Sequence, residues 1–587
     1  MCPFIKFIPL LRPAIELTCS TERFDWTSIK PSTNLEYHPC YTNAQCARLI
    51  LPLDYQNPND TRTVALAIAK IPAAVPDDDP RFGGSIFLNP GGPGGCATGL
   101  AVGLGPSLQR RLERSGHRHY EYIGIDGRGI GHSWPASNCF PGDLLSRLAF
   151  NMEQRGTGSL TESDHAIRYG LALSDGFGER CAMADKSGLN GGDIMAYAGT
   201  ASVARDMVEV ADKIAELRLR RREENGHYGC DEAKTTKDVA RIQYLGFSYG
   251  TILGHYLVSM FPERVGRLIL DGVMDPRDYA TGPGWTTNLA DTDKLYHTFF
   301  AGCHEAGPSI CALSRSGDTS GNDIESRFNT WFKKLEKDPL TSIGSDGDVR
   351  ILTGYDIRAY MGGGFYGPIA TFQTMAFILD AAITGNTARL FDAYFSEISP
   401  KRKANGGLYD DPLDPVAGDG GYAVRCGDGD DVTQKDVTWW REYAQNLTSS
   451  SFIFGSYWAN KRFICSGWKF KSNWRFTGPF TSPEPRKDAS GDPEPGYPAA
   501  PTLYLSTRLD HVTPLLSARD MRDVYPGAGL GVLDVVGHTT LGAGATSECI
   551  EKLVEEYLET GTVPAEESVC TVDCGPWDEE CEVEYTI

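Results

Sequence analysis

The fold is decided by residues 241–257, which read RIQYLGFSYGTILGHYL. The first five residues are typical of a buried β-strand, and those after position 250 are typical of a helix. The pentapeptide between them has the pattern G-x-S-x-G, which places Ser248 at the tip of a sharp strand-to-helix turn. Gly246 and Gly250 are both needed, because side chains there would collide with neighbouring backbone. An ordinary surface turn can spell the same five residues, but the flanking strand and helix favour a nucleophilic serine.

The composition of the chain is that of an ordinary globular protein. Of its 587 residues, 41% are hydrophobic and 23% are charged, and the mean hydropathy is -0.30. No apolar run reaches the roughly 18 residues that a membrane span needs, so no membrane partner is predicted. The formal net charge of -21 argues against a nucleic-acid partner, because phosphate binding requires a basic surface.

Short apolar segments alternate with helical segments through the first half of the chain. The first two apolar segments, at 47–53 and 64–71, are separated by a polar turn, and this pattern predicts an antiparallel hairpin. Helices are expected at about 200–224 and 251–261. Strands are expected at 47–53, 64–71, 85–88, 122–126, 242–245 and 268–270, and again at 502–506 and 531–536. Strands that alternate with helices and end in glycine-bearing loops predict the α/β class, with a doubly wound, mostly parallel sheet.

The segment from 276 to 497 interrupts this alternation. It has helical periodicity and many aromatic residues, and it lacks the repeated unit of a strand followed by a glycine loop. It ends in a proline- and glycine-rich stretch, 482–501, that is typical of a loop. We therefore predict a first part of the core at 1–275, an inserted, mainly helical cap at 276–497 and a C-terminal part of the core at 498–587.

A serine nucleophile requires a base, and the triad order in a sheet of this kind is serine, acid, histidine. His538 directly follows the last predicted strand, so we expect it to be the general base. His511 is less suitable because it adjoins Asp510, and adjacent residues rarely form an acid–base pair. The histidines that follow Ser248 are His255, His297, His304, His511 and His538.

The acid of the triad is expected to be Asp510, which comes soon after the strand at 502–506. Asp271, after the strand at 268–270, and Asp534, within the last strand, are the alternatives. The aspartate would orient the imidazole and stabilise its charged form.

An acyl-transferring serine also needs donors for the oxyanion. One is expected to be the backbone N–H of Tyr249, the residue after the nucleophile. The other is expected from the glycine-rich loop 89–95, where Gly92 or Gly91 can donate and Pro93 cannot. The alternatives for this loop are a plain turn or a phosphate loop, but the Gly-Lys-Ser/Thr of a Walker loop is absent.

The cysteines indicate disulfides more than a metal site. The chain has 16 of them, and its C-terminal part holds no CxxC pair and no histidine after them, as a zinc site would require. No metal or organic cofactor is predicted. The pairs expected to close loops are Cys40/Cys46, Cys303/Cys311 and Cys426/Cys465, and four further cysteines are Cys549, Cys570, Cys574 and Cys581.

The cysteines and two N-glycosylation sequons, at Asn59 and Asn446, favour the secretory pathway. The first twenty residues do not add support, because their apolar patch is shorter than a good signal peptide requires. A cytoplasmic location is the alternative. The sequence does not indicate an oligomeric state.

An ordered series of motifs spanning about residues 24–549 resembles the prolyl and tripeptidyl aminopeptidase-like serine exopeptidases. This is an α/β-hydrolase family with a TAP-like C-terminal domain, and the chain looks like a fungal member. The motifs are CARL at 46–49, NPGGPGG at 89–95, DGRGIGHS at 126–133, GFSYGT at 246–251, RLILDGV at 267–273, CGD at 426–428, CSGW at 465–468, DHVTP at 510–514 and GH at 537–538.

The resemblance implies an enzyme that releases residues or tripeptides from free peptide N-termini, through an acyl-enzyme on Ser248, with a cap that binds the amino group. It also implies that secreted, disulfide-bonded relatives exist. Cys96, Gly127 and Thr539 depart from the usual family pattern without removing a triad member. They leave open an alternative in which the substrate is an ester, thioester or amide of a small metabolite in a fungal natural-product pathway.

The expected partner is therefore a peptide or a small acyl substrate. A non-catalytic binding protein on the same fold is the alternative from a different class. Such proteins usually lose the serine or the histidine, whereas this chain keeps both Ser248 and His538.

Overall fold

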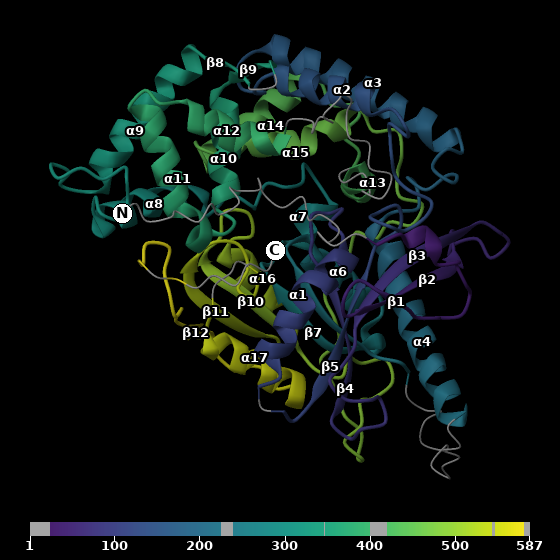
Figure 1. Ribbon diagram of the computed structural model, residues 1–587. Helices are drawn as coiled ribbons and strands as arrows, with labels where there is room; N and C mark the ends of the chain where they lie inside the picture. The colour runs from purple at the N-terminus through teal and green to yellow at the C-terminus, as the bar shows by residue number, and fades with distance from the viewer. Residues whose placement is uncertain are drawn as a thin grey trace.

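One sheet of ten strands forms the centre of the computed structural model, which describes residues 24–114, 116–224, 239–344, 347–398, 419–542, 546–579 and 581 (Figure 1). The strand order is β1-β2-β3-β5-β4-β6-β7-β10-β11-β12. Every neighbouring pair from β5 to β12 is parallel, and the pairs from β1 to β5 are antiparallel. The strands are β1 (His38–Cys40), β2 (Ala44–Pro52), β3 (Thr63–Ile71), β4 (Phe82–Asn89), β5 (His119–Ile125), β6 (Ile242–Phe247), β7 (Val265–Asp271), β10 (Thr502–Leu509), β11 (Gly529–Val536) and β12 (Ser568–Cys570).

The sheet is covered on both faces, as the nearly continuous apolar strands require. In β7, Leu268 and Leu270 belong to one buried apolar cluster and Ile269, between them, to a second cluster, because alternate side chains point to opposite faces. The helices α1 (Ala97–Leu112) and α17 (Glu548–Thr560) contribute to the second cluster. The helices α4 (Thr200–Glu224), α6 (Tyr249–Met260) and α16 (Leu515–Val524) contribute to the first. The protein is thus a doubly wound α/β-hydrolase fold, as predicted.

A mainly helical layer lies above the sheet (Figure 1). It also contains one small antiparallel hairpin of β8 (Leu340–Ile343) and β9 (Val349–Leu352). Its helices are α8 (Thr292–Ala306), α9 (Gly321–Lys337), α10 (Gly354–Gly364), α11 (Pro368–Ile383), α12 (Ala388–Ile398), α13 (Asp419–Asp428), α14 (Val437–Ser450) and α15 (Gly455–Phe463).

Two further helices of this cap come from the segment that the sequence assigned to the core. The prediction gave residues 1–275 to the core, whereas α2 (Leu144–Gly156) and α3 (Asp164–Lys186) lie in the cap layer (Figure 1). Arg155 of α2 pairs with Asp356 of α10 at 2.9 Å. A Cβ atom at Gly178 of α3 would lie 1.8 Å from the Gly467 carbonyl oxygen, so the backbones touch. No helix was expected at these residues from the sequence, and the contacts that place α2 and α3 in the cap are with distant segments.

Six disulfides hold the described chain. The three pairs expected from spacing are joined, and Cys139–Cys181 ties the segment before α2 to α3, a link that the sequence did not suggest. The four remaining cysteines named from the sequence pair as Cys549–Cys570 and Cys574–Cys581. Disulfides of this number are typical of an oxidising compartment. No helix in the described ranges is long and apolar enough to cross a membrane.

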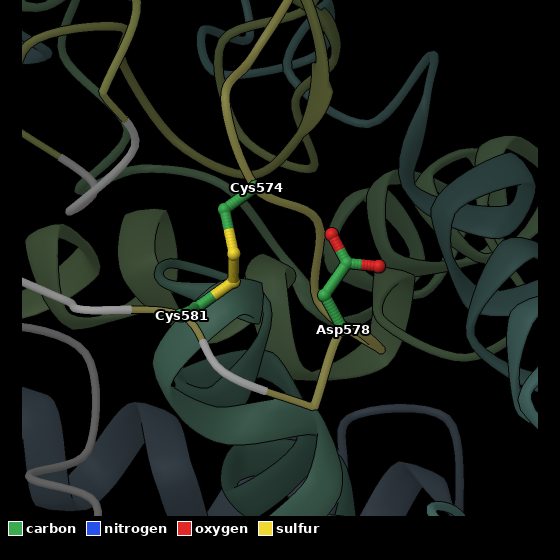
Figure 2. A group of neighbouring side chains, drawn as sticks. All are labelled: Cys574, Asp578 and Cys581. Carbon is green, nitrogen blue, oxygen red and sulfur yellow. A yellow bond between two sulfur atoms is a disulfide. The ribbon is translucent and has the colours of Figure 1, made fainter.

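Figure 2 shows the one group of three potential metal ligands in the described chain, formed by Cys574, Asp578 and Cys581. The two sulfurs are bonded to each other. The Asp578 carboxylate accepts the Gly575 N–H at 2.7 Å. Because a thiolate is the metal-binding form of cysteine, this group is a structural crosslink.

Arg128, within the glycine-rich stretch 127–131, has a structural role. This fully buried guanidinium donates to Asp206 of α4, with Nε at 2.6 Å and Nη2 at 2.8 Å. It also donates to the carbonyl of Pro52 at 2.7 Å and to that of Leu53. The buried ion pair therefore fastens α4 to the end of β2.

We expect Arg128→Met to lower the free energy of unfolding by about 3–5 kcal/mol, because it leaves the Asp206 carboxylate buried without its partner. The midpoint of thermal unfolding measures this. Arg441→Gln is the matched control, since Arg441 pairs with Asp164 at the surface and its loss costs below about 1 kcal/mol. Equal midpoints for the two variants would contradict the role of Arg128.

Candidate active site

Ser248 lies between β6 and α6 in a strained backbone conformation. Its φ is 56° and its ψ is -122°, in a region that L-residues rarely adopt. A Cβ atom at Gly246 would lie 2.5 Å from the Gly250 carbonyl oxygen, and one at Gly250 would lie 2.8 Å from the Asn89 carbonyl oxygen. The turn therefore tolerates only glycine at both positions, and it presents Ser248 at the carboxyl end of β6.

Asp510 and His538 follow two adjacent parallel strands. Leu509 of β10 is opposite Val536 of β11, so both residues leave the sheet at the same edge. The Asp510 Oδ2 lies 2.8 Å from the His538 Nδ1, and both side chains are almost fully buried. This contact fixes the orientation of the imidazole.

The Asp510 carboxylate is stabilised in its charged form. Burial by itself raises its pKa, but the charge and the hydrogen bond of His538 outweigh burial, so its pKa lies below the usual value. The N–H groups of Val512 and Thr513 donate to Oδ1 at 3.0 and 2.9 Å. The Thr513 hydroxyl donates to Oδ2 at 2.6 Å and lies 3.1 Å from the His538 Nδ1. Thr513, which the sequence argument did not single out, therefore contacts both members of the pair.

The structure does not place either alternative acid at His538 Nδ1. Asp534 is half exposed and pairs with Arg508 at 2.5 Å. His511 is buried, its Nδ1 lies 4.0 Å from the Asp510 Oδ1, and burial lowers its pKa to about 3. His511 is thus a neutral packing residue.

Asp271 has a different role at the same edge. Its backbone carbonyl accepts the Ser248 N–H at 3.0 Å. Its buried carboxylate accepts the N–H of Thr540 at 2.7 Å and that of Leu541 at 2.9 Å, and burial raises its pKa to about 6. A Cβ atom at the next residue, Gly272, would lie 3.4 Å from the His538 Cε1. The end of β7 therefore contacts both the serine turn and the loop that carries His538.

The glycine loop after β4 lies against the serine turn. A Cβ atom at Gly91 would lie 2.9 Å from the Ser248 Cβ and 3.0 Å from the Tyr249 backbone nitrogen. The Gly91 N–H donates to the Asn89 side chain at 3.0 Å. Because the Gly91 N–H already has this acceptor, Gly92 is the better of the two expected loop donors to join Tyr249 in an oxyanion site.

Comparisons with known proteins agree with this geometry. Residues 450–570 match the family model described as TAP-like protein. The chain is 24% identical over 554 residues to the serine protease Hip1 of Mycobacterium tuberculosis (strain ATCC 25618 / H37Rv), covering 91% of each chain. It is 23% identical to the tripeptidyl aminopeptidase of Streptomyces lividans, covering 91% of this chain and 84% of the relative. It is 26% identical to carboxylesterase B of the same Mycobacterium strain, covering 89% and 85%.

The chain has an α/β-hydrolase fold with a TAP-like C-terminal part. It is a serine hydrolase.

The cap of this TAP-like hydrolase contacts the histidine through Tyr366, between α10 and α11. The Tyr366 carbonyl accepts the His538 N–H at 3.0 Å. Its ring lies edge-on to the imidazole, with centroids 5.0 Å apart. Nothing in the local sequence marks Tyr366, because its contact is with a segment from the other end of the chain.

A second contact from the cap reaches Tyr249, the residue after Ser248. The Tyr249 hydroxyl is 2.5 Å from the Thr200 hydroxyl, which in turn donates to Asp428 of α13. The buried Asp428 also accepts from Tyr279 at 3.0 Å and from Ser472 at 3.1 Å. The CGD motif at 426–428 was the only sequence signal for this network.

We expect Asp510→Asn to lower kcat by about 10⁴-fold, because the amide favours the wrong tautomer of His538. Asp534→Asn is the matched control and should retain wild-type turnover, since Asp534 faces solvent beside Arg508. Hydrolysis of 4-nitrophenyl acetate by both variants provides the measurement. Loss of turnover in Asp534→Asn with activity kept in Asp510→Asn would reverse the assignment of the acid.

Proposed function

We propose that this protein is an exopeptidase that releases residues or tripeptides from free peptide N-termini. The observation that carries the proposal is the buried Asp510–His538 pair at the sheet edge where the strained Ser248 turn ends. The relatives named serine protease and tripeptidyl aminopeptidase, which align over nine-tenths of the chain, support the peptide as substrate.

In the proposed mechanism, His538 accepts the hydroxyl proton of Ser248 as the oxygen attacks the scissile carbonyl carbon. The backbone N–H groups of Tyr249 and Gly92 stabilise the developing oxyanion. The C–N bond then breaks, and the proton held on His538 goes to the leaving amine. Water, deprotonated by His538, attacks the acyl carbon, the bond to the Ser248 oxygen breaks, and the proton on His538 returns to that oxygen as the acid leaves. Asp510, ionised throughout, stabilises the imidazolium.

We also propose that the protein acts in the secretory pathway or outside the cell. Its disulfides support this, because glutathione and thioredoxin keep thiols reduced in the cytosol. The asparagines of both sequons, Asn59 and Asn446, are exposed, as glycan attachment requires.

Hydrolysis of an ester, thioester or amide of a small metabolite is the second candidate function. A relative named carboxylesterase B aligns with this chain at 26% identity. An aminopeptidase needs a carboxylate for the substrate ammonium, and Asp428, the buried cap carboxylate linked to the serine turn, already accepts from three hydroxyl groups.

A fluorogenic panel tests the proposed function. It contains aminoacyl and tripeptidyl amides with free and with blocked N-termini, beside short acyl esters. We expect free peptides to be cleaved and blocked ones to be spared, because an exopeptidase recognises the terminal ammonium. Ser248→Ala, the control, should show no turnover. Hydrolysis of esters alone would replace the exopeptidase with the metabolite hydrolase, and an active Ser248→Ala would reject Ser248 as nucleophile.

A further inference from the structure

One face of the cap helix α13 is held against the catalytic edge at two points. At its N-terminal end, Gly421 touches the oxyanion loop, since a Cβ atom there would lie 2.4 Å from the Pro93 carbonyl oxygen. At its C-terminal end, Asp428 receives the Thr200 hydroxyl, which also contacts Tyr249. Residues four and seven positions apart share a helix face. Arg425, four residues after Gly421, therefore lies on this face between the two contacts.

The Arg425 guanidinium has no counter-ion in the described structure. Its Nε is buried without a hydrogen-bond partner, and the group lies over the Tyr422 ring, 4.5 Å from the centroid. Burial lowers its pKa, and the titratable groups whose charges act on it are the hydroxyls of Tyr422, Tyr279 and Tyr457 rather than a carboxylate. Within the described ranges, this partly buried cation thus has no carboxylate to compensate it.

Other arginines of the cap show that this arrangement is unusual within the molecule. Arg462, which is buried more deeply, donates to the carbonyl oxygens of Pro283 and Asp430. Four further arginines of the cap each pair with a carboxylate, in the ion pairs Arg155–Asp356, Arg315–Asp380, Arg327–Asp318 and Arg358–Glu336. Each of these five arginines therefore has a polar partner, whereas Arg425 has none among the described residues.

We propose that Arg425 binds a carboxylate of the substrate and makes this enzyme selective for anionic substrates. A planar guanidinium accepts a carboxylate in a two-pronged hydrogen-bonded pair, and desolvation strengthens that pair. The substrate would be a peptide with an acidic side chain or a free carboxyl group, or an acyl compound with a second carboxylate. The inference rests on the proposed hydrolysis at Ser248, but it holds for peptide and ester substrates alike.

The selectivity is tested with substrate pairs that differ in one charge. The pairs are 4-nitrophenyl butyrate against mono-4-nitrophenyl glutarate, and tripeptidyl amides with glutamate against glutamine at each position. We expect wild type to prefer the anionic member of at least one pair in kcat/KM. Arg425→Gln should lower kcat/KM for that member by about ten- to a hundredfold, because it loses a charged hydrogen bond, and should leave the neutral member unchanged. Arg425→Lys should retain part of the preference.

A second measurement does not depend on turnover. Covalent labelling of Ser248 by a neutral fluorophosphonate reports an intact nucleophile, and added glutarate should slow the labelling of wild type but not of Arg425→Gln. If labelling fails in wild type, the proposed hydrolysis at Ser248 is wrong. If labelling proceeds at one rate with and without glutarate and no substrate pair shows an anionic preference, the role of Arg425 is wrong.

Two controls separate binding from folding and from general charge effects. Arg486→Gln removes the same charge from an exposed position and should keep the wild-type preference. Arg425→Gln should not lower the thermal midpoint. The substitution leaves no carboxylate without its partner, and it removes a charge from a partly buried position. A lowered midpoint together with an equal loss on both members of every pair would assign Arg425 to structure and overturn the proposal.

Discussion

The two halves of the candidate active site are tied together by Asp271, at the end of β7. Its carbonyl receives the Ser248 N–H, and its carboxylate receives N–H groups just after His538. Ser248 and His538 are separated in sequence by the whole inserted part of the cap. Their positions depend on β7 lying between β6 and β10, and one residue at the end of that strand then anchors both loops.

Two buried aspartates at this edge show how surroundings set the charge of a carboxyl group. Asp510 faces the imidazole of His538, and the pair lowers the pKa of Asp510 in spite of burial. Asp271 is compensated chiefly by neutral backbone donors, which do not fully offset burial, so its pKa rises to about 6. The lowered pKa of Asp510 suits a carboxyl group that must stay ionised beside an imidazolium. The raised pKa of Asp271 suits a carboxyl group that only anchors two loops.

The cap is part of the catalytic edge rather than a separate cover. The helix α13 touches the glycine loop 89–95 through Gly421 and is linked to Tyr249 through Asp428 and Thr200. The Tyr366 carbonyl of the cap accepts the His538 N–H. Arg425 lies on α13 between Gly421 and Asp428, and among the described residues its guanidinium has no carboxylate partner.

The sequence by itself determined the strand-to-helix turn at Ser248, the two-sided sheet and the order of serine, acid and histidine, since these follow from local periodicity and from the shared edge of parallel strands. Only the tertiary structure decided that His538 contacts Asp510 rather than Asp271 or Asp534, and that α2 and α3 belong to the cap. It also decided that Arg425 meets no carboxylate among the residues that the structure describes. Those outcomes depend on contacts between segments far apart in the chain, and an amphipathic helix or a polar residue carries no local sign of which distant surface it will meet.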